Sequence, residues 1–192
     1  MLKFRKADPL FKIAICYFSL IFLTEVLTST LSLVDISNAN VSNIFYLFEG
    51  VILIFFILKM NSQRKFVFYI SILIYSAIWL IYNYEIGKLN VYNSDFRTLE
   101  CILIQLLSGF TLYKQGLKTS IPIFINHHII FLFGIFLYFG ANIILFYLTN
   151  ILIDIDKEYA INMWAIHSII NMITIAIFTY SIYFIIPKAN HD

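Results

Sequence analysis

The chain has 192 residues, of which 61% are hydrophobic and only 12% are charged, with a formal net charge of +2. Soluble domains carry about 25% charged residues, so this composition argues against a water-soluble globule and favours a lipid bilayer as the solvent. No run of Lys and Arg is long enough to indicate a nucleic-acid partner. Cys16 and Cys101 lack metal-ligand spacing, which favours packing roles for both thiols.

Six apolar runs approach or reach the length of about 20 residues that a helix needs to cross a membrane. In chain order they cover residues 13–33, 43–58, 66–84, 98–113, 125–149 and 161–186. The runs are continuously apolar rather than alternating, which favours helices over barrel strands. The second and fourth are short and depend on neighbouring helices. We therefore predict an all-α polytopic membrane protein, with residues 1–192 forming a single transmembrane helical-bundle domain of six transmembrane helices.

The basic residues predict the direction of these spans. Only three of the 13 Lys and Arg, namely Lys88, Arg97 and Lys157, fall in the loops on one side. The rest fall on the side that holds both chain ends. Since Lys and Arg accumulate in cytoplasmic loops, we expect both termini in the cytoplasm. The first apolar run is too long for a cleaved signal peptide and lacks a cleavage site, so it is expected to be the first span.

Eight side chains with polar or ionisable groups lie in or at the rim of these spans. They are Glu25, Glu49, Glu100, Gln105, Asn142, Trp164, His167 and Asn171. With a helical rise of ~1.5 Å per residue, most lie within roughly 9–15 Å of the outer ends of their spans. An ionisable group in a span is costly and usually faces protein or water, so the pattern predicts one ligand-binding pocket near the periplasmic face.

Each of these residues also has a simpler structural interpretation. Asn142, Asn171 and Gln105, taken singly, are more typical of interhelical hydrogen bonds. Glu100 is close enough to Arg97 and the membrane surface to be ion-paired or solvated. For Glu25 and Glu49 the functional interpretation is favoured, because two carboxylates within spans are costly without a partner.

Four segments carry a resemblance to a known group of proteins. They are NIFYLFE at 43–49, NSDFRTLE at 93–100, YFGAN at 138–142 and WAIHSIIN at 164–171. Through them the chain resembles an uncharacterised family of short bacterial multi-pass membrane proteins with six or seven helices. The resemblance covers residues 13–187, and it implies an all-helical fold in the bacterial cytoplasmic (inner) membrane without implying an activity.

The function remains open between several classes. A small-ligand sensor or receptor would bind a polar or cationic molecule from the periplasm, and its short loops would require a signalling partner protein or a homo-oligomer. A structural or accessory subunit without a ligand carries similar weight, and a proton or cation transporter carries less. An intramembrane enzyme is least favoured, because no metal-binding or serine-nucleophile motif is present. Neither a metal nor another cofactor can be assigned from the sequence.

Overall fold

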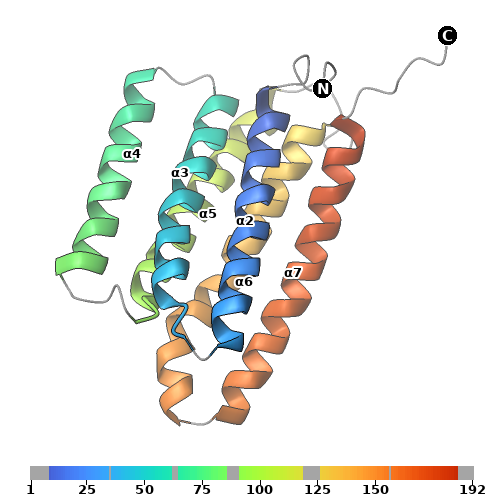
Figure 1. The fold of residues 1–192 in the computed structure, drawn as a ribbon. Helices are drawn as coiled ribbons and strands as arrows, with labels where there is room; N and C mark the ends of the chain where they lie inside the picture. Colours follow the sequence, from blue (N-terminus) through green and yellow to red (C-terminus); the bar gives the residue numbers. More distant parts are fainter. Residues whose placement is uncertain are drawn as a thin grey trace.

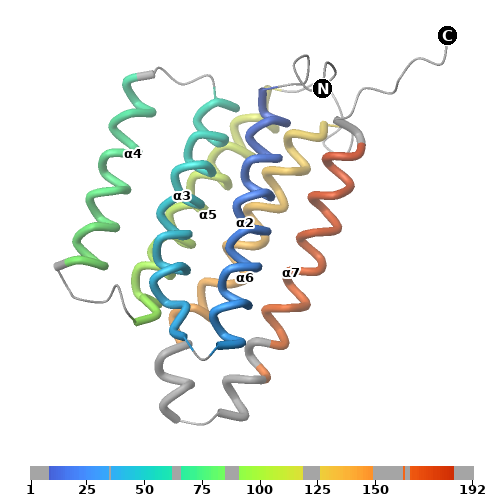
Figure 2. The backbone as a smooth tube through the Cα atoms, in the orientation of Figure 1, coloured from blue at the N-terminus to red at the C-terminus, as the bar shows by residue number. Residues whose placement is uncertain are grey.

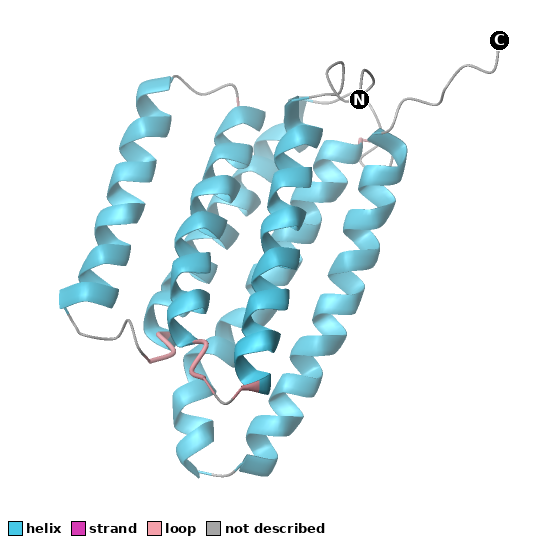
Figure 3. Cartoon of the chain, viewed as in Figure 1, coloured by secondary structure: helices cyan, strands magenta, loops and turns pink. Residues whose placement is uncertain are grey.

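The structure, a computed structural model, describes residues 9–34, 36–61, 65–85, 91–118, 126–155 and 157–185. These residues form six α-helices and one π-helical turn, and they contain no strand (Figure 3). The elements are α2 (Pro9–Leu33), α3 (Ala39–Met60), α4 (Lys65–Leu80), η1 (Ile81–Glu85), α5 (Ser94–Lys118), α6 (His127–Ile155) and α7 (Lys157–Ile185). The all-α prediction is confirmed for this part of the chain.

Each helix runs antiparallel to the next one along the chain, so the beginning of α2 and the end of α7 lie at the same end of the bundle (Figures 1 and 2). Helix α3 packs against α2, α4 and α5, while α6 packs along both α5 and α7. Helix α4 stands at the edge of the bundle (Figure 1). The helices are therefore joined mainly through α3, α5 and α6.

Within the described residues, five stretches are long and apolar enough to cross a membrane. They are Pro9–Leu33, Ala39–Met60, Phe66–Tyr84, His127–Leu148 and Ala165–Tyr183. Helix α5 is not one of them, because its first two turns include Asp95, Arg97 and Glu100. The sequence argument predicted six spans, and the structure supports five helices of this kind together with a sixth, more polar helix of 25 residues.

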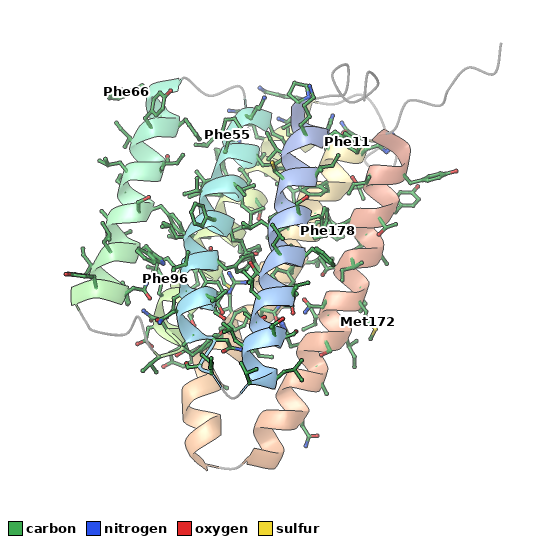
Figure 4. The ribbon with its side chains drawn as sticks, viewed as in Figure 1. Phe11, Phe55, Phe66, Phe96, Met172 and Phe178 are labelled. Atoms are coloured by element: carbon green, nitrogen blue, oxygen red, sulfur yellow. The ribbon has the colours of Figure 1, made fainter. Side chains whose placement is uncertain are left out.

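Large apolar side chains cover much of the outside of the bundle. Phe66 on α4 and Met172 on α7 point away from it and are 73% and 64% exposed. Phe96 and Phe178 lie between helices and are 0% and 5% exposed (Figure 4). Soluble monomers rarely expose large contiguous apolar areas, so this surface is consistent with that of a membrane protein.

The buried interior has a region rich in charged and polar side chains and a mainly apolar region, which follow one another along the helix axes. The apolar region lies toward the end where α2 begins, and aromatic rings pack closely in it. The Phe131 ring centroid lies 4.7 Å from that of Phe178 and 4.9 Å from that of Phe56. The polar region lies toward the opposite end, where α3 and α5 begin, and it contains the candidate site.

Candidate functional site

Arg97, in the first turns of α5, is the centre of the buried polar region. Its side chain is only 2% exposed. Its Nη1 atom donates a hydrogen bond to Glu49 Oε2 on α3 and another, of 2.7 Å, to Glu100 Oε2. Both carboxylates are also buried, at 2% and 0% exposure. A buried charge is stable only when it is paired, so these three side chains form one electrostatic unit, the Glu49–Arg97–Glu100 cluster.

Two tyrosines extend the cluster to the neighbouring helices. The Tyr17 hydroxyl on α2 donates to Glu49 Oε1 at 3.0 Å. The Tyr75 hydroxyl on α4 lies 2.8 Å from Glu100 Oε1 and 2.7 Å from the backbone carbonyl oxygen of Tyr46 on α3. Helices α2, α3, α4 and α5 therefore each contribute a hydrogen-bonding side chain to the same network.

Aromatic rings enclose the guanidinium group. Its Cζ atom lies 4.4 Å from the ring centroid of Tyr46, 4.9 Å from that of Phe146 and 5.4 Å from that of Phe139. Cations are attracted to aromatic faces within about 6 Å, more strongly where water is excluded. Phe139 and Phe146 belong to α6, so a fifth helix contacts the cluster, and the rings shield the ion pairs from solvent.

His167 on α7 belongs to a second hydrogen-bonded group beside the cluster. The Asn142 side-chain Nδ2 donates to the Tyr138 carbonyl at 2.8 Å, which turns the Asn142 Oδ1 atom toward His167 Nδ1 at 2.6 Å. Because an amide oxygen only accepts, Nδ1 carries the hydrogen. His167 Nε2 then accepts from Asn171 Nδ2 at 3.1 Å. The two asparagines thus hold His167 as the neutral Nδ1–H tautomer.

Phe146 joins the two groups. Its ring centroid lies 5.6 Å from that of His167, and the Arg97 Cζ lies 4.9 Å from the same ring. Tyr138 also interacts with Arg97, and its ring centroid lies 6.2 Å from that of His167. Phe146 and Tyr138 are therefore neighbours both of His167 and of Arg97, the ion-pair partner of Glu49.

Three asparagines support the site at the end where α5 begins. Asn93 Oδ1 accepts from the backbone N–H of Phe96 at 3.0 Å, which caps the helix. The Asn93 Nδ2 atom donates to Asn83 Oδ1 at 3.2 Å, and Asn43 Nδ2 donates to the Val91 carbonyl at 2.9 Å. These contacts attach the start of α5 to α3 and η1, so that Arg97 reaches Glu49.

The structure brings together most, but not all, of the residues predicted from the sequence. Glu49 and Glu100 lie in the cluster, and Asn142, His167 and Asn171 form the adjoining group. Gln105 is half-buried and packs against Gly140 of α6. Glu25 lies on an exposed face of α2, apart from the cluster. The side chain of Trp164 lies outside the described residues.

One expectation about the site is corrected. The sequence argument placed Arg97 in a loop on the outer side and left Glu100 near the surface, whereas both are buried. The reason is that α5 begins at Ser94, four residues before the predicted start, because Asn93 caps it inside the bundle. Of the two alternatives for Glu100, the ion-paired one is confirmed, because Arg97 and Glu100 lie three residues apart on one helix.

The structure also has a groove that none of the cluster residues lines. That groove, of about 730 Å³, lies near the end of the bundle where α2 begins. It is lined by Leu112, Gly116, Ile129, Ile130, Phe133, Ala176, Ile177 and Tyr180. Among the described residues, no group of three or more His, Cys, Asp or Glu side chains could hold a metal ion.

Comparisons with protein-family models, with curated proteins and with solved structures find no match to this chain. The resemblance to a bacterial membrane family therefore stays a prediction. The part of the chain that the structure describes is all-helical, and five of its helices are long and apolar enough to span a membrane.

Proposed function

We propose that the chain is an integral membrane protein of the bacterial inner membrane with six transmembrane helices and both termini in the cytoplasm. Helix α5, at 25 residues, is about 37 Å long, enough to cross the ~30 Å hydrocarbon layer. It packs against α3 and α6, and its Arg97 and Glu100 side chains are buried, which shields these two charged groups from lipid. Lys12, Lys59 and Lys118 all lie at the end where α2 begins, which the positive-inside rule assigns to the cytoplasm.

Cysteine labelling tests this orientation. In a cysteine-free background we introduce either Val91→Cys or Lys118→Cys, two exposed positions at opposite ends of the bundle. A membrane-impermeant thiol reagent added to intact spheroplasts is expected to label the Val91→Cys variant alone. Labelling of the Lys118→Cys variant alone would reverse the orientation, and labelling of both would refute the six-span arrangement.

The proposed role is that of a sensor or receptor module that acts through a partner membrane protein. The observation that carries it is that one buried ionic cluster receives side chains from α2, α3, α4 and α5 and contacts two rings of α6. A ligand shifts a conformational equilibrium only when it binds two packings with different affinity. A change of charge or hydrogen bonding at this cluster would alter the packing of five helices at once.

The apolar region beside the cluster favours this role over transport. Leu53 and Ile104 follow Glu49 and Glu100 by about one helical turn, toward the end where α2 begins. The side chains at most 1% exposed around that level are mainly apolar and include Leu53, Ile57, Ile104, Leu132 and Ile135. The polar one among them, Ser108, donates to the Gln105 carbonyl of its own helix. An ion path needs polar groups or water on both sides of its binding site. This mainly apolar layer separates the cluster from the opposite end of the bundle.

The reactivity of Cys101 distinguishes a sensor from a rigid accessory subunit. Cys101 follows Glu100 and is 0% exposed. In a Cys16→Ser variant reconstituted in nanodiscs, a sensor should show a several-fold change in the rate of maleimide labelling of Cys101 relative to the denatured protein under the same condition, a ratio that cancels the effect of pH on the thiol itself. The conditions tested are a series of pH values and the addition of small amines such as ammonium and choline, and at least one of them is expected to produce the change. The Cys16→Ser/Cys101→Ser double variant, which has no cysteine, measures the background labelling. Constant protection of Cys101 throughout would contradict the sensor and favour the accessory subunit.

A further inference from the structure

The Glu49–Arg97–Glu100 cluster contains one more acidic group than basic groups. If both carboxylates were ionised, the cluster would carry one uncompensated negative charge among side chains that are at most 2% exposed. Such a charge costs several kcal/mol in a medium of low dielectric constant. A proton on one of the two carboxylates would make the cluster neutral without a further ligand.

The hydrogen bonds around Tyr75 indicate which carboxylate holds this proton. The Tyr75 hydroxyl has one hydrogen, yet it lies 2.7 Å from the Tyr46 carbonyl oxygen and 2.8 Å from Glu100 Oε1. Two acceptors cannot share one hydrogen at these distances. If Glu100 Oε1 is protonated, it donates to the Tyr75 oxygen, and Tyr75 donates to the Tyr46 carbonyl. Each of the two contacts of the Tyr75 hydroxyl then contains one hydrogen.

The surroundings of Glu49 are those of an ionised carboxylate. Its Oε1 atom accepts from the Tyr17 hydroxyl at 3.0 Å, and its Oε2 atom accepts from Arg97 Nη1. Tyr17 can donate its single hydrogen to Glu49. The second hydrogen on Arg97 Nη1 is directed to Glu100 Oε2 at 2.7 Å, the oxygen that remains an acceptor in a protonated acid.

We propose that Glu100 is the proton-binding group of this cluster, with Glu49 the ionised partner of Arg97, and that a proton is the ligand that the cluster takes. The charged and titratable groups that face Glu100 are Arg97, Glu49 and Tyr75, with Cys101 adjacent on α5. The proposed function enters only where protonation of the cluster is taken to change the helix packing. The position of the proton on Glu100 is argued from the hydrogen bonds and does not depend on that function.

The matched substitutions Glu100→Gln and Glu49→Gln test the assignment. A glutamine amide reproduces a protonated acid, since its N–H can donate to Tyr75 and its oxygen can accept from Arg97. The Glu100→Gln variant should therefore keep the wild-type melting temperature. In the Glu49→Gln variant the guanidinium has an ionised partner only if Glu100 releases its proton, which leaves the Tyr75 hydroxyl between two acceptors, so this variant should melt roughly 10 °C lower. Glu25→Gln, at the exposed carboxylate of α2, is the control and should melt as wild type. The proposal would be overturned if Glu100→Gln melted at a lower temperature than Glu49→Gln, if both melting temperatures fell equally, or if neither fell.

Infrared spectroscopy locates the proton even where Glu49→Gln does not yield folded protein. A protonated carboxylic acid has a carbonyl stretch at a higher frequency than the stretches of an ionised carboxylate. We expect this band in the wild-type protein at neutral pH and its loss in Glu100→Gln. Absence of the band from wild type, or its persistence in Glu100→Gln, would overturn the assignment.

The sensor is tested separately in the Cys16→Ser background. There the rate of Cys101 labelling, divided by the rate in the denatured protein at the same pH, should change with pH, and the further substitution Glu100→Gln should abolish this change. A proton on Glu100 without such a change would refute the sensor while leaving the assignment intact.

Discussion

Replacing Arg97 with methionine is expected to lower the free energy of unfolding by about 3–5 kcal/mol, the usual cost of removing one partner of a buried ion pair. The side chain is 2% exposed and donates to two carboxylates. Without it, Glu49 would be a buried anion whose remaining donor is Tyr17. The loss is measured by reversible unfolding of the purified protein in mixed micelles of increasing denaturing-detergent content.

Lys118→Met is the matched control for this experiment. Lys118 is an exposed cation at the other end of α5, so the same substitution there should change the free energy of unfolding by less than about 0.5 kcal/mol. An Arg97→Met variant as stable as the Lys118→Met variant would show that the guanidinium is not held in a buried ion pair.

Replacing Gly50 with alanine is expected to separate α4 from α3. A Cβ atom at Gly50 would overlap the ring and hydroxyl of Tyr75, the side chain that joins α4 to the cluster. Overpacking of this kind typically costs about 1–3 kcal/mol. The displaced hydroxyl would also lose its contacts with Glu100 and with the Tyr46 carbonyl. The variant should unfold at a lower denaturant content than wild type.

Gly116 provides the control for the added methyl group. No other residue comes within 4 Å of a Cβ built there, although it also lies within a helix. Since alanine favours a helix over glycine by about 1 kcal/mol, Gly116→Ala should be neutral or slightly stabilising. Equal effects of the two substitutions would mean that Tyr75 does not pack against Gly50.

The helices could be predicted from the sequence because apolar length is a strong signal. Each of the six predicted runs corresponds to a helix, and the ends differ by a few residues, as with the start of α5 at Ser94 instead of 98. The start of α5 could not be predicted from hydropathy, because charged residues such as Asp95 and Arg97 score as polar and are assigned to a loop. The cap by Asn93 and the pairing of Arg97 with Glu49 depend on tertiary contacts.

The site could be predicted only in part. Buried acids are conspicuous in an apolar run, so Glu49 and Glu100 were identified, as was His167 with its two asparagines. Tyr17 and Tyr75 were missed, because tyrosine is common both between packed helices and at the membrane surface. Glu25 was assigned to the same pocket on depth alone. Depth does not specify which face of α2 meets α3, and the structure places Glu25 on the exposed face.

A double-mutant cycle between Glu49 and Arg97 tests most directly whether the buried ion pair holds these helices together. The cycle compares the free energies of unfolding of wild type, Glu49→Gln, Arg97→Met and the double variant. The two single variants should each be strongly destabilised, and the double variant, which leaves no unpaired charge, should recover much of the loss through a coupling of about 2–3 kcal/mol. Additive losses, with a coupling near zero, would contradict the pairing of these two side chains.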